Sequence, residues 1–380
     1  MKLLALLVLI VLFAACGQET VPDAPGVHSY EYADAVFGDV RIAFIHVGDI
    51  TDLGWTYRHH QGTLDMMAAL NIRDEQVLNF FNVVPGVAVG EAIDYAINWG
   101  ANLIFGTSFA FEIHFVEAAR EHPDVQFFHT TGNQAVASGL PNMHNYSTIH
   151  NFFRYMTQAR YLSGIAAGLR TETNVLGFVA AFPFPEVING FTAFYLGALS
   201  VNPDVTMYVM YANAWNNPTL ETQVAHSLID RGADVTAQHV DSPAPQIVAQ
   251  ERGVWSVGYN YDTIYIAPDS VLFSPMFDWS VYLIYAVDNV VRGIPIPQGY
   301  HPGFDESMVV LSTANPATIA PGTYAAIELA QAYFLDGRNI FTGPMYDTNG
   351  NQILAPGEEF IEPMAAPSWA YIIEGVTILQ

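Results

Sequence analysis

Two pairs of aromatic side chains could hold a flat ligand between them. The stretch GDITDLGWTYRHHQG, residues 48–62, places Trp55 and Tyr57 directly after the apolar run VRIAFIHV. The stretch AAFPFPEV places Phe182 and Phe184 at the end of a second apolar run, NVLGFVAA. Stacking of a planar base on one aromatic side chain contributes roughly 1 to 3 kcal/mol. We therefore expect Trp55 and Phe184 to sandwich a flat heterocycle, although a ring in either place could instead close the edge of a core.

Polar side chains after other apolar runs could read the edge of such a ligand. Asp241, in TAQHVDSPAP, could accept hydrogen bonds from a ring nitrogen, an exocyclic amine or a sugar hydroxyl, and it could also cap the next helix. Asn260, in SVGYNYD, can donate and accept at once, as amides do at an adenine edge, and it equally suits a turn. Further aromatic candidates, each able to line a site or seal a core, are Phe109, Trp215 and Trp279.

These residues are positioned by alternating strands and helices. From residue 39 onward, short runs rich in β-branched and aromatic residues alternate with longer helical patterns such as AVGEAIDYAINWG and PEVINGFTAFYLGAL. This alternation predicts βαβ units and parallel sheets. Ligands of open parallel sheets bind beyond the carboxyl ends of the strands. The residues that directly follow each strand are therefore the candidates for a binding site.

One pattern of strands and helices occurs twice along the chain. AIDYAINWGANLIFGTS and VAHSLIDRGADVTAQHV each contain an amphipathic helix, a glycine suited to a left-handed C-cap, and then a strand. The two glycines, Gly100 and Gly232, and the first strands of each half, around Phe44 and Phe178, are separated by nearly the same offset. The equal offset predicts two similar α/β lobes, and two lobes imply a cleft between them.

Composition restricts the partners. The chain has 380 residues, 51% of them hydrophobic, which is enough for two domains with cores. Its formal net charge is −25, so extended contact with nucleic acid or an anionic membrane surface is unfavourable. A neutral or cationic small ligand is the easier partner.

The N-terminus reads as an export signal. Lys2 precedes an apolar run from Leu3 to Ala15, which is too short to span a bilayer as a helix and suits a signal peptide. FAAC resembles a bacterial lipobox, and its Cys16 is the only cysteine of the chain, so no disulfide forms within one chain. We expect a lipid anchor at Cys16 and an extracytoplasmic protein tethered by the polar residues that follow. An ordinary secretory signal with an incidental cysteine is the alternative.

Catalytic signatures are lacking in the sequence. It contains no H-E-x-x-H, G-x-S-x-G, G-x-G-x-x-G or Walker loop, and the adjacent His59 and His60 diverge on a helix. We expect no cofactor, no metal and no enzyme activity. A purine-cleaving enzyme is the rival from another class, and it would need a general acid or base in the cleft.

Several stretches together resemble the basic membrane protein family of ABC-transporter substrate-binding lipoproteins, whose characterised members bind purine nucleosides or nucleobases. The stretches, which occur in the right order over most of residues 40–292, are DLGWTYRHHQG, QARYLSGIAAGL, GFVAAFPFPEVINGFTAFYLGALSVNP, LIDRGADVTAQHVDSPAP, GVWSVGYNYD and LFSPMFDWSVYLIYAV. From about residue 293 onward the similarity is looser. The family name does not describe this chain's charge, which is strongly acidic.

The resemblance implies a type I periplasmic-binding-protein fold, in which two Rossmann-like lobes joined by three crossovers close over a ligand. It places Trp55 and Phe184 at the sandwich, Asp241 and Asn260 at the polar edge, and Trp279 near the hinge, where its size favours a free base. It implies residues 1–15 as signal peptide, 16–38 as tether, 39–149 with about 278–320 as the first lobe, and 150–277 with about 321–380 as the second.

The function expected from this resemblance is capture. A monomeric, membrane-anchored protein takes up a purine nucleobase or nucleoside, with an adenine-like ligand favoured, and an ABC permease recognises its closed form. Tyr57, Phe109 and Trp215 complete the expected ligand-binding set. A chemosensory receptor for a small ligand remains the alternative among binding proteins.

Overall fold

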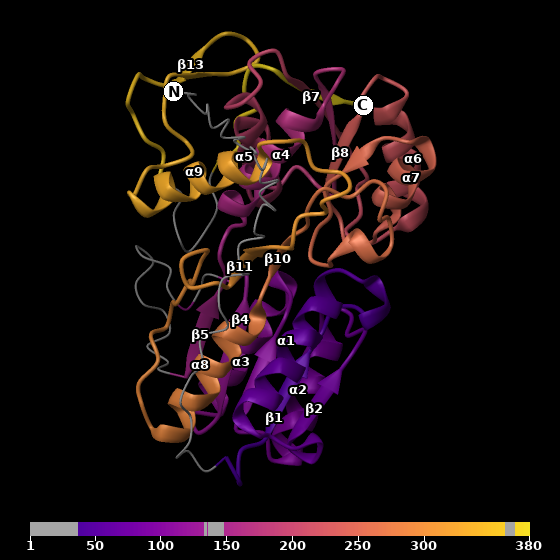
Figure 1. Ribbon diagram of the computed structural model, residues 1–380. Coiled ribbons are helices and arrows are strands. Elements are labelled where there is room, and N and C mark those ends of the chain that lie inside the picture. The colour runs from indigo at the N-terminus through magenta and orange to yellow at the C-terminus, as the bar shows by residue number, and fades with distance from the viewer. Residues whose placement is uncertain (1–36, 133–134, 136–147, 362–368) are drawn as a thin grey trace, which may run out of the picture. The chain divides into compact units, whose positions relative to one another are not determined.

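The computed structural model describes residues 37–132, 135, 148–361 and 369–380, and these residues contain two five-stranded parallel sheets flanked by helices (Figure 1). The expected α/β fold with two lobes is confirmed. The predicted signal peptide, Cys16 and nearly all of the predicted tether lie outside the described residues. None of the helices in the described ranges has the length and apolar character needed to cross a membrane.

The first sheet has the order β2-β1-β3-β4-β5, with all neighbours parallel. Its strands are β1 (Ile42–Ile45), β2 (Val77–Phe80), β3 (Leu103–Gly106), β4 (Gln126–Thr130) and β5 (Ile149–Phe152). The helices between them are α1 (Trp55–Leu70), α2 (Val87–Trp99) and α3 (Glu112–Glu121). Every residue of β1 and β3 is buried, as expected for strands covered by helices on both faces.

The second sheet repeats the plan of the first. Its order is β14-β7-β6-β8-β9, so β7, β6, β8 and β9 correspond to β2, β1, β3 and β4. Its strands are β6 (Val175–Ala180), β7 (Thr206–Tyr211), β8 (Val235–His239), β9 (Trp255–Ser256) and β14 (Val376–Leu379). The helices are α5 (Pro185–Leu199), α6 (Pro218–Ile229) and α7 (Ala244–Arg252). Gly100 and Gly232 both have left-handed backbones, with φ of 98° and 97°, as the duplicated pattern predicts.

The remaining elements connect and complete the lobes. α8 (Trp279–Arg292) packs against α1, whereas α4 (Thr157–Arg170) packs against α5 and α9 (Thr323–Leu335). β10 (Pro275–Phe277) pairs with β11 (Val309–Leu311), and β12 (Met345–Tyr346) pairs with β13 (Gln352–Leu354). The chain therefore passes between the lobes after β5, before α8 and after α8, and Figure 1 shows β10 and β11 between the two sheets.

The limits of the two lobes along the chain remain a proposal. We propose that the first lobe ends at Phe152 rather than at residue 149, because β5 pairs with β4 in the first sheet. The limits of the later segments stay as proposed.

Some elements were not anticipated. The strand β2 lies in QVLNFF, where no strand was expected, and its residues are only partly buried at the sheet edge. The apolar run that precedes Asn260 forms only a short strand, β9, at Trp255 and Ser256. Asn260 has a left-handed backbone, with φ of 59°, which ends extended structure there.

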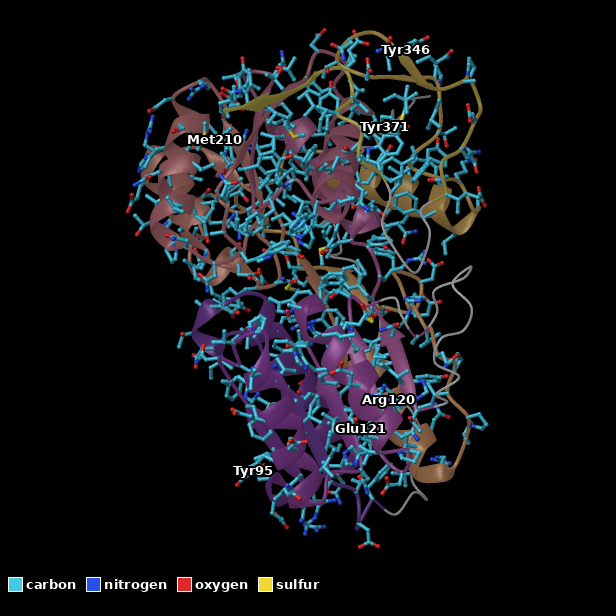
Figure 2. The ribbon with its side chains drawn as sticks, turned by 180° about the vertical axis from the view of Figure 1, so that it is seen from behind. Tyr95, Arg120, Glu121, Met210, Tyr346 and Tyr371 are labelled. Carbon is cyan, nitrogen blue, oxygen red and sulfur yellow. The ribbon has the colours of Figure 1, made fainter. Side chains whose placement is uncertain are left out.

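Each lobe has its own apolar core beneath its helices. The first-lobe core contains Phe44, Phe105, Phe152 and Tyr282, and Trp279 is fully buried among them. The second-lobe core contains Phe178, Phe194 and Trp369. Figure 2 shows side chains filling the space between helices and sheets in both lobes, while Tyr346 and Tyr371 lie on the surface.

Candidate functional site

A pocket of about 260 Å³ lies where the carboxyl ends of the strands of both lobes meet. Its first-lobe residues follow β1, β3 and β4, and its second-lobe residues follow β6, β7, β8 and β9. The lining residues are Val47, Gly48, Asp52, Trp55, Thr56, Thr107, Ser108, Phe109, Thr131, Glu186, Trp215, Asn216, His239, Asp241 and Tyr259. The position agrees with the general rule for ligands of open parallel sheets.

The first turn of α1 is held by Asp52. The Asp52 carboxylate accepts hydrogen bonds from the backbone N–H groups of Gly54 (2.9 Å), Thr56 (2.8 Å) and Tyr57 (3.0 Å). These donors have no partner within the helix, and a carboxylate at a helix N-terminus is also favoured by the helix dipole. Asp52 therefore determines where α1 begins, and with it the position of Trp55 at the pocket.

Replacing Asp52 with alanine should lower the free energy of unfolding by about 1 to 2 kcal/mol, because three N–H donors, two of them buried, lose their acceptor. Urea-induced unfolding measures this loss. Asp49→Ala is the matched control, since Asp49 accepts two exposed hydrogen bonds, one from the backbone of Thr51 and one from the Asn82 side chain, and the loss of stability should be smaller. Equal losses in the two variants would contradict this role for Asp52.

The Trp55 ring is oriented by contacts within the first lobe. Its Nε1 donates to the carbonyl oxygen of Thr107 (2.6 Å), which directly follows β3. The ring centroid lies 4.7 Å from that of His59 and 5.4 Å from that of Trp279, both in edge-to-face geometry. One side of the indole is thus fixed to the core, and another part of it lines the pocket.

On the second-lobe side, Trp215 lines the pocket, and Phe184 is not among the lining residues. Phe184 precedes Pro185 with an extended backbone, is 50% exposed, and stacks on Phe182 with centroids 5.4 Å apart. Trp215 lies beside both phenylalanines, at 5.5 and 6.1 Å. The structure therefore places Trp55 and Trp215 in the lining of one pocket. Phe184 lies beside Trp215 and is not part of this lining.

The other sequence candidates divide between the pocket and its surroundings. Phe109 and Asp241 line the pocket, and Phe109 is also exposed to solvent. Tyr57 instead packs against Tyr261, and the fully buried Trp279 stacks on His59, so that it seals the core beneath Trp55. Asn260 is fully buried, with neither amide atom in a hydrogen bond to a described residue, and it lies outside the lining set.

The pocket is acidic. Asp52, Glu186 and Asp241 line it, and none of the described lining residues is a lysine or an arginine. Burial and the nearby carboxylates of Asp52 and Glu221 raise the pKa of Asp241 well above its ordinary value. A ligand that brings N–H or O–H donors would relieve this crowding of negative charge, whereas a phosphate would add to it.

His239, Tyr259 and Arg160 form a buried polar cluster next to Glu186. His239 Nε2 is hydrogen-bonded to the Tyr259 hydroxyl (3.2 Å) and lies 3.6 Å from the Glu186 carboxylate. Burial lowers the pKa of His239, so the ring is neutral at pH 7. The fully buried Arg160 guanidinium lies over the Tyr259 ring and donates to the carbonyl oxygen of Gln238 (2.6 Å).

The sequence reading did not assign Asp52, Glu186, His239 or Tyr259 to the site. A signal for Asp52 was present, because aspartate two residues before the glycine of DLGW is typical of a helix start. Arg160 gave no such signal, because a cation within an otherwise helical pattern reads as a surface residue. Within the described ranges no group of three or more histidine, cysteine or acidic side chains could hold a metal ion.

Comparison of the sequence with known proteins finds a matching family and similar proteins. A family model described as "Bmp: ABC transporter substrate-binding protein PnrA-like" matches residues 39–318. A purine-binding protein of Brucella abortus is 33% identical over 325 residues, which cover 84% of this chain and 88% of that one. A putative ABC transporter glucose-binding protein of Haloferax volcanii is 33% identical over 284 residues, 73% of this chain and 68% of that one.

Solved structures share the fold. An ABC transporter solute-binding protein from Conexibacter woesei superposes with a TM-score of 0.64 at 17% sequence identity, covering 78% of this chain and 97% of that one.

Proposed function

Because the chain belongs to the family of PnrA-like ABC transporter substrate-binding proteins, we propose that it captures a purine nucleobase or nucleoside outside the cytoplasm and presents it to an ABC permease. Proteins of this family bind and deliver their ligands rather than convert them. The name of the Brucella relative supports a purine, and that of the Haloferax relative makes glucose the alternative to be tested.

The observation that carries the proposal is the pair of indole rings in one pocket. Trp55 comes from the first lobe and Trp215 from the second, and both line the same cavity. A planar heterocycle offers two π-faces, so a site with one large aromatic ring from each lobe suits it better than a puckered sugar. Closure of the lobes over the base then depends on how much better the closed form binds it.

The acidic side of the pocket suits a base whose polar edge carries hydrogen-bond donors. Glu186, which lines the pocket, is an acceptor when ionised, so it suits a ligand edge with N–H donors, such as the exocyclic amine of an adenine-like base. A nucleotide should bind at least tenfold more weakly than its nucleoside, because its phosphate would meet three carboxylates and no lining lysine or arginine.

The proposal includes a lipid anchor that attaches the protein to the membrane. We propose that the apolar run before Cys16 is removed as a lipoprotein signal and that Cys16 carries the lipid. Cys16→Ser should then release the protein from the membrane fraction of the expressing cells. Intact-mass measurement of the wild-type protein should show a lipid adduct, and an unmodified cysteine would leave only the secretory alternative.

Identification of the bound ligand tests the function. Small molecules released from the denatured, freshly purified protein would be identified by mass spectrometry, and calorimetry would measure affinity for adenine, hypoxanthine, adenosine, AMP and glucose. We expect a purine to be recovered and bound most tightly. Recovery or preference of glucose would replace the purine by a sugar, and breakage of the glycosidic bond of adenosine on long incubation would favour the enzyme.

A further inference from the structure

The start of α1 touches the second lobe directly at Asp241. Gly54, the residue before Trp55, is buried against the backbone of Asp241. A Cβ atom on Gly54 would overlap the carbonyl oxygen of Asp241 and lie 2.8 Å from its Cα. Atoms that are not bonded do not approach so closely, so only glycine permits this contact. The two lobes therefore meet here main chain to main chain, beside the pocket.

Asp241 is also hydrogen-bonded to Trp215 and lies beside the start of the Trp55 helix. Its backbone N–H donates to the carbonyl oxygen of Trp215 (2.7 Å). On the other side, the backbone of Asp241 is packed against Gly54, and the nearby Trp55 N–H lowers the pKa of the Asp241 carboxyl. A single residue thus lies against the backbone next to each of the two residues whose rings come from opposite lobes.

The loop that carries Asp241 is itself braced. The neighbouring Ser242 hydroxyl donates to the buried carboxylate of Glu221, whose other oxygen accepts the backbone N–H of Asn217 (2.7 Å). Glu221 therefore ties the loop after β8 to the loop after β7, which carries Trp215. Because these loops are fixed to each other, the position of Asp241 on α1 determines the position of Trp215 relative to the first lobe.

We propose that Asp241 is a positioning residue that sets the spacing between the Trp55 and Trp215 rings by docking on the Gly54-Trp55 backbone, rather than a residue that reads the ligand's edge. The inference rests on the proposed function, since the spacing matters only for a ligand held between two rings. It assigns Asp241 a role different from the ligand hydrogen bond expected from the family resemblance.

Two kinds of variant separate positioning from direct contact. Asp241→Ala removes the carboxylate that lies near the Trp55 N–H, and Asp241→Asn keeps an oxygen on the same side chain. Gly54→Ala leaves every polar group in place and forces the two backbones apart. Gly90→Ala on α2 is the matched control, because a Cβ there would meet nothing within 4 Å.

The first measurement is affinity for a series of ring ligands, namely unsubstituted purine, adenine and hypoxanthine. We expect Asp241→Ala and Gly54→Ala each to weaken binding roughly tenfold, by a similar factor for all three ligands, since a wider gap reduces stacking for any ring. Asp241→Asn should lose less than Asp241→Ala, and Gly90→Ala should bind like the wild type. A loss in Asp241→Ala that changes with the donor and acceptor pattern of the ring would overturn the positioning role.

The second measurement needs no ligand. Spin labels at Glu91 on α2 and Arg231 after α6, in a Cys16→Ser background, report the distance between the lobes by pulsed electron paramagnetic resonance. We expect Gly54→Ala and Asp241→Ala to shift this distance to larger values, and Gly90→Ala to leave it unchanged. Unchanged distances in both cleft variants would refute the contact. If the wild type binds no purine, the proposed function fails, and these distances still decide whether Asp241 spaces the lobes.

Discussion

Replacing Trp215 with alanine should weaken purine binding roughly 5- to 150-fold, because one of the two stacking surfaces, worth about 1 to 3 kcal/mol, is removed. The fold should be little affected, since the Trp215 side chain is 38% exposed and lies in the loop after β7 rather than in a core. Calorimetry with the tightest-binding purine measures the change.

Phe184→Ala is the matched control for Trp215→Ala. Phe184 follows a strand in the same lobe and is 50% exposed, but it does not line the pocket, so its affinity loss should stay within about threefold. A larger loss in Phe184→Ala than in Trp215→Ala would restore the sandwich of Trp55 and Phe184 that the sequence indicated.

Trp55→Ala should also weaken binding, by at least tenfold. The Trp55 ring contacts both His59 and Trp279 in the first-lobe core, so this variant will lose stability as well. Trp55→Phe keeps an aromatic face and should recover part of the affinity. Unchanged affinity in a folded Trp55→Ala protein would refute the stacking role.

Acid should destabilise the protein strongly between about pH 6.5 and pH 4. Burial lowers the pKa of His46 and of His129 to about 4, and it lowers the pKa of His59 well below its ordinary value. The folded-state pKa lies below the unfolded value, so the stability is fully present above pH 6.5 and is lost as the pH falls. For His46 and His129 the loss approaches about 3 kcal/mol each, a large share of a typical total stability.

The free energy of unfolding in urea, measured at several pH values in that range, checks this prediction. Glu221 and Asp241, whose pKa values burial raises, act in the opposite sense, so the decisive quantity is a difference between variants. His129→Phe should be less stable at pH 7, because the hydrogen bond to the Ser108 carbonyl is lost, but its stability should fall less steeply with acid. The same slope in both proteins would contradict the role of His129.

The repeating plan of the fold could be predicted from the sequence because its signals are local. Strand and helix periodicity, the proline that opens α5 and the left-handed glycines at 100 and 232 act within a few residues of themselves. The matching stretches of the family are likewise local, each being a helix, or a strand with the loop or helix that follows it. Thus the two sheets, and a site at their carboxyl ends, were expected before any coordinates.

Which side chains enter the site was decided only by tertiary contacts. Phe184 and Trp215 both follow strands in one lobe, and nothing in their neighbouring residues distinguishes them. Phe184 stacks on Phe182 and is not among the lining residues, whereas Trp215 lines the pocket and its carbonyl accepts the Asp241 N–H. Trp279 likewise became a core residue because His59 and Phe277 pack on its ring.

By itself, the sequence predicted two α/β lobes with aromatic residues and Asp241 after their strands, because the alternation of strands and helices and the duplication are local patterns. Only the tertiary structure decided that Trp55 and Trp215 line one pocket and that Asp241 contacts the backbone of Gly54 and of Trp215. The direction of a side chain in a loop depends on partners from distant parts of the chain, and no periodicity in the sequence records those partners.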